Sequence, residues 1–238
     1  MPSFNAHKET SPIMNGADVP FRMAGGHLHF GWPGRLMPSK MTRVSMVKAM
    51  DAVLGVACVS LFAKYDDKRR RKLYGRAGEF RLPEHGLEYR VLSNAWLIHP
   101  VFAQLVFELG RKALFMGEHN LLDALWDATE EETRKCINEC DVKLAKKLLT
   151  RNEKVLTAIL ASITREWDDG KRLFKLFMDG AESILNPNKG IKENWLIDVP
   201  TGYDDTNHKF VGWRNHSFGV NCSIDSVMKS LKAGAKEV

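Results

Sequence analysis

The amino-acid sequence predicts a mixed α+β fold, in which a few short strands accompany a larger number of helices. Residues 25–31 and 87–92 alternate polar with apolar side chains, which is the pattern of a strand that buries one face. Residues 42–63 instead carry apolar side chains at steps of three and four, as a helix packed on a core requires. The later stretch 129–164 is rich in Glu, Lys, Leu and Ala, which also favours helices.

The composition is that of a folded globular protein with a modest positive charge. Of the 238 residues, 44% are hydrophobic and 27% are charged, which argues against a fibrous or disordered chain. The formal net charge of +6 favours anionic partners such as nucleotides, nucleic acid or acidic side chains.

Several features predict a cytoplasmic protein. The four cysteines form no Cys-x-x-Cys pair, which fits a reducing compartment. The longest uncharged apolar stretch, residues 52–63, is shorter than the roughly 20 residues that a membrane-spanning helix needs, so no membrane span is expected. The N-terminus lacks the basic and apolar segments of a secretory signal.

The first part of the chain is predicted to begin as a loop over residues 1–20, which are polar and contain three prolines. The strand at 25–31 and the helix at 42–63 follow it. Residues 64–72 are strongly charged and are expected to be solvated or to face an anion. They lead into residues 74–81, a loop that is interrupted by glycines and carries arginines.

The second part of the chain is predicted to be mainly helical. A turn at residues 83–86 leads into the strand at 87–92. The helices expected after this strand span 100–116, two segments of 129–164 joined near Arg151 and Asn152, and 171–185. The aromatic-rich tail, residues 195–222, is expected to form short strands or an ordered loop.

Two histidines on the first predicted strand are candidate site residues. His27 and His29 are two positions apart, so their imidazoles share one face and could bind one metal ion, or a metal ion and a phosphate. Taken alone, they could equally be structural histidines held by hydrogen bonds.

Two charged pairs follow along the chain. Arg76 and Arg81 are five residues apart in a glycine-containing loop, which suits contact with phosphate oxygens but is also typical of a basic surface loop. Glu88 and Arg90 share one face of the second predicted strand, where they could belong to a site or form an exposed ion pair.

These segments, in this order, resemble motifs of the glutamine synthetase and glutamate-cysteine ligase superfamily. Residues 24–31, Ala-Gly-Gly-His-Leu-His-Phe-Gly, resemble its His-x-His strand. Residues 74–81, Tyr-Gly-Arg-Ala-Gly-Glu-Phe-Arg, resemble its loop in which two arginines face the nucleotide phosphates. Residues 86–94, Gly-Leu-Glu-Tyr-Arg-Val-Leu-Ser-Asn, resemble its final Glu-x-Arg strand. The surrounding sequence, over about residues 2–117, is most similar to the phage-type amidoligases, which are carboxylate-amine ligases.

The resemblance implies an antiparallel sheet of the glutamine synthetase-like type, curved around a funnel and present only in part, followed by a helical region. It implies that His27 and Glu88 help to hold Mg²⁺ or Mn²⁺. The residues implied to contact the phosphates of ATP are His29, Arg76, Arg81 and Arg90, of which Arg81 and Arg90 are the catalytic candidates.

The implied reaction is an ATP-dependent ligation of a carboxylate to an amine. The carboxylate attacks the γ-phosphate of ATP, and the amine then captures the acyl phosphate as an amide or isopeptide bond. Metal ions and arginines are suited to this chemistry because they offset the charge that keeps two anions apart. The implied substrates are a carboxylic acid and an amine, each a small molecule, a peptide or a protein.

The match to the superfamily is incomplete at the N-terminus. The superfamily has a Glu-x-Glu strand early in its domain, but only Glu9 and Asp18 precede His27, in loop-like sequence. Residues 2–6 also resemble a segment from the middle of phage amidoligases, so the chain is expected to begin partway through the fold. A second polypeptide could complete the site, the gene could be a decayed remnant, or the chain could be a non-catalytic phage structural or interaction protein. The first alternative is preferred because the phosphate-facing residues are all present.

We therefore predict two parts, a partial catalytic core at residues 1–118 and a mainly helical region at 119–238. The helical region could cover the sheet, bind the acceptor amine or mediate assembly. The protein is expected in the cytoplasm, that of the host if a phage encodes it.

Three further features are not assigned a function. The basic run at 68–72 lacks interleaved aromatic residues, which does not favour nucleic acid as a partner. Cys136 and Cys140 are one helical turn apart, but no second pair supports a metal site. His208 and His216 are expected to form local hydrogen bonds.

Overall fold

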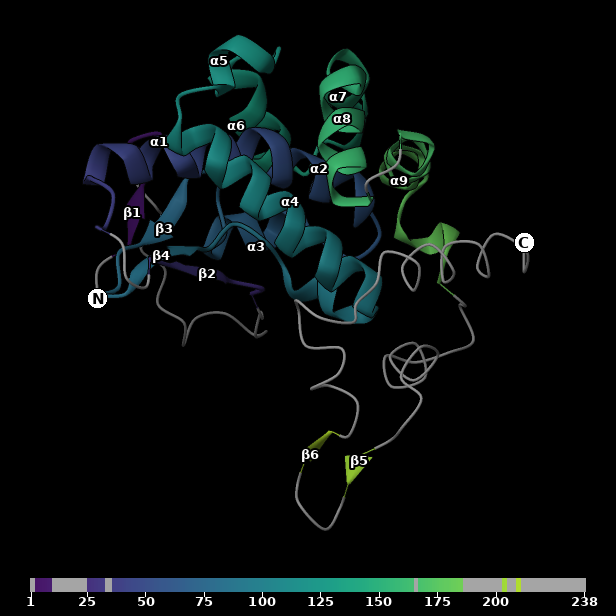
Figure 1. Cartoon of the computed structure of the whole chain (residues 1–238), viewed down its shortest axis with the longest axis horizontal. Helices are drawn as coiled ribbons and strands as arrows, with labels where there is room; N and C mark the ends of the chain where they lie inside the picture. The colour runs from purple at the N-terminus through teal and green to yellow at the C-terminus, as the bar shows by residue number, and fades with distance from the viewer. Residues whose placement is uncertain are drawn as a thin grey trace.

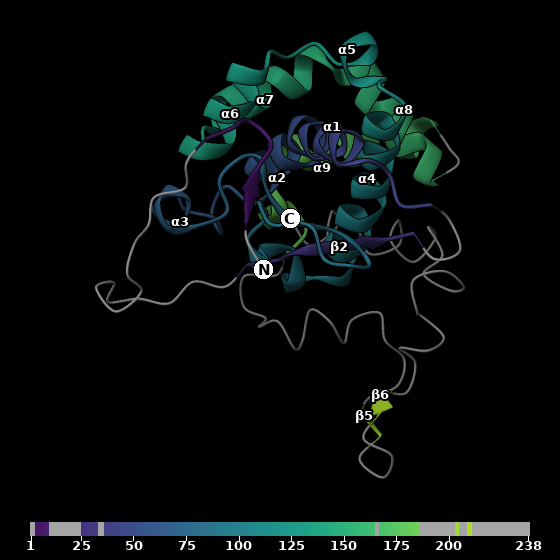
Figure 2. The ribbon, with the colours of Figure 1, turned by 90° about the vertical axis from the view of Figure 1, so that its left-hand side faces the viewer.

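The computed structural model describes residues 3–9, 25–32, 36–164, 167–185, 203–204 and 209–210. It confirms the α+β class, because a four-stranded antiparallel sheet lies against a larger set of helices (Figure 1). The helices α1, α2 and α4 lie on one side of the sheet in both views (Figures 1 and 2).

The sheet has the strand order β1-β3-β4-β2, and all neighbouring strands are antiparallel. The strands are β1 (Phe4–Asn5), β2 (Leu28–Gly31), β3 (Glu79–Arg81) and β4 (Gly86–Tyr89). Strands β2 and β4 confirm the two predicted strands, although β4 ends at Tyr89. The loops predicted at 1–20 and 74–81 are wrong at β1 and β3, because strands of two or three residues are too short to show alternation.

Alternate residues of the strands point to opposite faces of the sheet. Leu28 and Tyr89 are cross-strand partners and are fully buried on the face that packs against the helices. His29, Glu88 and Arg81 form the adjacent row across β2, β4 and β3, and this row points to the opposite face. The helices therefore anchor one face of the sheet, and most of the predicted site residues lie on the other.

A continuous helical segment, residues 40–61, forms the centre of the protein and confirms the helix predicted over 42–63. It consists of α1 (Lys40–Met50), a π-helical turn η2 (Asp51–Gly55) and α2 (Val56–Leu61). It packs against α4, α6, α7 and α9, which explains its continuous apolar sequence. Its length and composition would also suit a membrane-spanning helix, but 83% of its most apolar window is buried within the protein, as in the core helix of a soluble protein.

The charged run at 64–72 is solvated over part of its length, as expected, and buried at two arginines. Residues Lys68–Leu73 form the short helix α3, in which Arg70 and Arg71 are buried. Asp66 lies 3.0 Å from Arg70 Nε and 2.8 Å from Arg71 Nη2, and both guanidiniums also donate to the carbonyl of Val91. These two arginines are not solvated but face an anion, the Asp66 carboxylate, which is the other arrangement expected for the run. Their second acceptor, the carbonyl of Val91, comes from the chain after β4, which local sequence cannot show.

The remaining helices surround the central segment. After a 3₁₀ turn η3 (Asn94–Ile98), α4 confirms the helix predicted over 100–116. The helices are α4 (Pro100–Glu118), α5 (Leu122–Leu125), α6 (Glu130–Glu139), α7 (Val142–Arg151), α8 (Glu153–Thr164) and α9 (Trp167–Asp179). The stretch predicted as two helices contains three, because Cys140 adopts a left-handed φ of 49° and ends α6. Helix α9 begins and ends before the predicted bounds, and a 3₁₀ turn η4 (Ala181–Ser183) follows it.

In the tail, β5 (Tyr203–Asp204) pairs with β6 (Lys209–Phe210), in agreement with the expected short strands. His208, His216 and Asp18 lie outside the described residues. Buried side chains from before and after residue 118 form one hydrophobic cluster, and the division of the chain at that residue stays a prediction.

Candidate active site

The face of the sheet opposite the helices gathers most of the predicted site residues. His29, Glu88 and Arg81 are direct partners across three strands, so their side chains are neighbours. His27 and Arg90 are each two residues from a member of this row along the chain, and both approach the Glu88 carboxylate. The structure thus brings together five of the six side chains proposed from the sequence.

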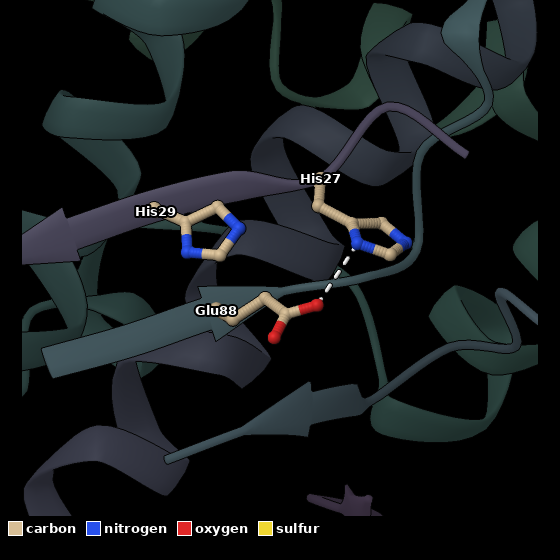
Figure 3. A group of neighbouring side chains, drawn as sticks. All are labelled: His27, His29 and Glu88. Carbon is tan, nitrogen blue, oxygen red and sulfur yellow. Dashed lines mark ion pairs between the residues drawn. The ribbon is translucent and has the colours of Figure 1, made fainter. Parts of the chain in front are cut away.

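The carboxylate of Glu88 is the centre of this group. Its Oε1 atom lies 2.9 Å from His27 Nδ1, 3.3 Å from Arg90 Nε and 3.9 Å from Arg81 Nη1. Figure 3 shows the Glu88 carboxylate pointing towards the ring of His27, with the ring of His29 beside them. Because one carboxylate faces two guanidiniums, the site carries an excess of positive charge and would attract anions.

His27 is held in one tautomer by two partners. Its Nε2 atom lies 2.7 Å from the hydroxyl of Tyr74, while its Nδ1 faces Glu88. A carboxylate only accepts hydrogen bonds, so Nδ1–H donates to Glu88 and Nε2 accepts from the Tyr74 hydroxyl. Burial, and then the nearby charge of Arg90, lower the pKa of His27 below its ordinary value. Burial raises the pKa of Tyr74, so its hydroxyl keeps the proton that it donates.

The double glycine ahead of β2 allows this contact. A Cβ atom at Gly25 would lie 1.1 Å from the hydroxyl oxygen of Tyr74, and one at Gly26 would lie 2.1 Å from Trp96 Nε1. Gly25 also forms a β-bridge to Ser93, which continues the sheet beyond β2. Glycine fits at these positions because a side chain at Gly25 would displace the Tyr74 hydroxyl that contacts His27, and one at Gly26 would displace Trp96.

The two arginines on this face retain unused hydrogen-bonding capacity. Arg90 Nη1 donates to Ser3 Oγ at 3.1 Å, and its guanidinium lies over the Tyr74 ring at 5.3 Å. Within the described part of the chain, the buried Nε atom of Arg81 makes no hydrogen bond, and Arg90 Nε faces Glu88 Oε1 at 3.3 Å as an ion pair without forming a hydrogen bond to it. Buried unsatisfied donors are uncommon in folded proteins, and a phosphate oxygen is the kind of acceptor that guanidinium groups prefer.

The same face also offers a set of metal-binding atoms. His27, His29 and Glu88 each contribute one nitrogen or carboxylate oxygen, and these atoms all lie within 4.8 Å of one another. The 2.9 Å between His27 Nδ1 and Glu88 Oε1 suits ligands at right angles on a divalent ion, which lie about 3 Å apart when the bonds are about 2.1 Å. His29 is therefore a third candidate ligand, besides the phosphate contact predicted for it.

Comparison with known families decides the class of protein. The family model described as Phage phiEco32-like COOH.NH2 ligase-type 2 matches residues 12–197, which is more than half of the chain. The chain belongs to this carboxylate-amine ligase family. Searches of curated proteins and of solved structures returned no match. The membership confirms the resemblance to the phage-type amidoligases and does not favour the alternative of a non-catalytic structural protein.

The sixth predicted residue of this ligase, Arg76, has different partners. Its Nη2 atom lies 3.0 Å from Glu9 Oε2, and the same carboxylate is bound by Arg134 of α6. The structure thus connects Arg76 to the N-terminal segment and to the helical region, whereas the other five residues gather at Glu88.

Sequence reasoning missed three further residues of the site. Tyr74 lies within the arginine loop motif, but a single aromatic residue gives no signal of a hydrogen bond to a distant histidine. Ser3 comes from the segment predicted to be a loop. His85, on the turn before β4, stacks against His29 with ring centroids 5.9 Å apart. The sequence indicated a site role for His85 only through its position on an exposed turn.

Proposed function

We propose that this chain catalyses the ATP-dependent ligation of a carboxylate to an amine at the Glu88 face of the sheet. The observation that supports this reaction is the convergence of two imidazoles and two guanidiniums on the Glu88 carboxylate. The family membership supports the ligase class. The use of ATP and the acyl phosphate intermediate are part of the proposal.

The proposed chemistry has two steps. An oxygen of the acid attacks the γ-phosphorus of ATP, and the bond to the bridging oxygen breaks to release ADP and leave an acyl phosphate. The amine nitrogen then attacks the carbonyl carbon, phosphate leaves with the electrons of the C–O bond, and the nitrogen loses a proton. Positive groups fixed near the reacting oxygens lower the barrier because they stabilise charge where it develops.

Arg81 and Arg90 are the proposed catalytic residues. Their forked guanidiniums suit phosphate oxygens, and neither Nε–H group is used in a hydrogen bond within the described residues. Contacts with Glu88, Tyr74 or Ser3 order both side chains before a ligand binds. His29 would contact a phosphate or the metal. Arg76 could contact a phosphate only if the phosphate displaced Glu9 from it.

His27 and Glu88, with His29 beside them, are the proposed metal ligands. A metal ion bound here would offset the charge of the phosphates. The lowered pKa of His27 favours a neutral ring, as metal binding requires. Because Nδ1 is the atom that faces Glu88, metal binding there would move the ring proton to Nε2, where it can be donated to the Tyr74 hydroxyl oxygen. Two imidazoles and one carboxylate suit Mn²⁺ better than Mg²⁺, which prefers oxygen ligands.

A second polypeptide that completes the site remains part of this proposal. The sheet would then form part of a glutamine synthetase-like funnel, and the second chain would supply carboxylates that precede His27 in the superfamily. Glu9 is a poor substitute for them because arginines already hold its carboxylate. The proposed location is the cytoplasm of the host cell.

The direct test is ADP formation by the purified chain, alone and mixed with the product of the adjacent upstream gene. The assay would contain ATP, Mn²⁺ or Mg²⁺, and panels of acids and amines. We expect Arg90→Gln to lower the rate about 10²–10³-fold, as the loss of one charge-stabilising donor does. Arg111→Gln is the matched control, because Arg111 is 67% exposed and forms an ion pair with Glu108, three residues away on the same helix. Absence of acid-dependent and amine-dependent ADP formation in every mixture would contradict the proposal.

A further inference from the structure

Four nitrogen atoms contact the carboxylate of Glu9. Arg134 Nε lies 2.8 Å from Oε1, and Arg134 Nη2 contacts the same oxygen. Arg76 Nη2 and Asn138 Nδ2 lie 3.0 and 3.4 Å from Oε2. Burial alone would raise the pKa of Glu9, but the hydrogen bond from Arg134 and the charges of both arginines outweigh it and lower that pKa. Glu9 is therefore bound as an ionised carboxylate.

The groups that hold Glu9 are positioned independently of it. Arg134 and Asn138 are four residues apart on α6, so they share one face of that helix. Asn138 Oδ1 accepts a hydrogen bond from the backbone N–H of Ala77 at 2.9 Å, which turns its Nδ2 towards Glu9. Because Ala77 directly follows Arg76, this bond joins the arginine loop to α6 without Glu9. The arrangement can persist when Glu9 leaves.

The charge and exposure of this group suit a ligand from solution. Two guanidiniums face one carboxylate, so removal of Glu9 would leave two positive charges side by side. The side chains of Glu9, Arg76 and Arg134 are 15%, 28% and 36% exposed, so solvent reaches the ion pairs. Ion pairs that water can screen contribute little to stability, and an external anion can compete with them. The buried Nε of Arg76 also lacks an acceptor among the residues that the structure describes.

We propose that Arg76, Arg134 and Asn138 form a binding site for a carboxylate of an acidic ligand, and that Glu9 occupies this site as an internal competitor in the free chain. Planar guanidinium forks match the geometry of a carboxylate, and the structure shows them holding one. In a carboxylate-amine ligase the acid substrate would supply this group. That identification of the ligand rests on the proposed function, whereas carboxylate binding itself does not. The site also gives the helical region a role, because α6 provides two of its three side chains.

The test is a titration of the full chain with L-glutamate, without ATP or metal, measured by calorimetry in every variant and, where Arg134 is retained, also through the NMR signal of its Nε–H group. We expect Glu9→Gln to bind L-glutamate more tightly than the unmodified chain, because the competitor is removed; the gain would be about tenfold if Glu9 filled the site in about nine molecules of ten. Glu108→Gln, which alters an exposed pair with Arg111, is the matched control and should change nothing. Addition of Arg134→Gln to Glu9→Gln should abolish the binding.

Two further measurements keep the proposal open to refutation. If Glu9→Gln does not fold, Glu9→Asp retains the charge on a shorter side chain and should bind L-glutamate with intermediate affinity. A purely structural ion pair predicts no gain in affinity in either variant, and that result would overturn the proposal. Inorganic phosphate is expected to bind more weakly than L-glutamate, and equal or tighter binding of phosphate would contradict the assignment to a carboxylate. Because no ATP is present, failure of the ligase assay and failure of this assay are separate outcomes.

Discussion

We expect the buried carboxylate of Asp51, on the central helix, to contribute more than any other buried charge to holding the N-terminal segment in place. Its side chain is fully buried; Oδ1 accepts from the Tyr89 hydroxyl at 2.7 Å, and Oδ2 lies 2.7 Å from His7 Nε2. His7 Nδ1 lies 2.8 Å from Glu130 Oε1. Because both partners of His7 are carboxylates, both ring nitrogens donate. Burial opposes the charged ring, but the hydrogen bonds and charges of Asp51 and Glu130 raise the pKa of His7 above 6.5.

We predict that Asp51→Asn lowers the free energy of unfolding by about 3 kcal/mol, at the lower end for removal of one partner from a buried ion pair. The lower end applies because His7 can lose its proton and so avoid an unpaired buried charge. The amide can accept from Tyr89 only by turning its NH₂ group towards His7, which must then be neutral. For a chain of this length the melting temperature should fall by about 6–12 °C.

The effect should depend on pH in a defined direction. A group whose pKa is raised on folding contributes stability that is fully present below its unfolded pKa and is lost as the pH rises through its folded pKa. The difference between the unmodified chain and Asp51→Asn should therefore be largest below pH 6.5 and should shrink at alkaline pH. Glu130→Gln is the control. Because the side chain of Glu130 is half-exposed, this substitution should lower the free energy of unfolding by less than Asp51→Asn does. Urea unfolding followed by circular dichroism measures both, and a difference below about 0.5 kcal/mol at acidic pH would refute the reasoning.

Three other substitutions test the site and its support. A metal ion at His27 Nδ1 would require the ring proton to sit on Nε2, where the Tyr74 hydroxyl oxygen can accept it. Tyr74→Phe removes this acceptor, so Mn²⁺ affinity measured by calorimetry should fall roughly 10–100-fold, and an unchanged affinity would exclude His27 as a ligand held in this way. Gly25→Ala places a Cβ atom 1.1 Å from the Tyr74 hydroxyl oxygen. The free energy of unfolding, measured in urea, should therefore fall by more than about 2 kcal/mol. If the alanine variant is as stable as the unmodified chain, the contact with Tyr74 is absent. Thr129→Ala removes the capping box with Glu132 at the start of α6 and should cost about 1 kcal/mol, whereas no loss would indicate that the cap is not formed.

The sequence predicted those parts of the fold whose pattern is local and repeated. The helix over 42–63 was predictable because its core-facing side chains recur at helical steps, and α4 for the same reason. The strand at β2 was short, but its flanking glycines and alternating histidines marked it. Strand β1 was not predictable, because Phe4–Asn5 becomes a strand only by pairing with β3, far along the chain.

The part of the candidate site that lies on strands was predictable from the sequence. Alternation placed His27 with His29 and, separately, Glu88 with Arg90, and the resemblance to the superfamily implied that the two strands share one site. The structure brings His27, His29 and Glu88 together. The partner of Arg76 could not be predicted, because Glu9 lies in a segment without a pattern and its other partner, Arg134, lies on a helix of the second half. Contacts between distant segments depend on packing that periodicity does not record.

The central claim is that the Glu88 face binds a divalent metal together with ATP. The most direct measurement is the affinity of the full chain for Mn²⁺ in the presence of ATP, by electron paramagnetic resonance, for the unmodified chain and His27→Ala. We predict a loss of affinity of more than about hundredfold in His27→Ala, because loss of a ligand should exceed the loss of its supporting hydrogen bond. Equal affinity in the two proteins, or no ATP-dependent binding in either, would contradict this account of the site.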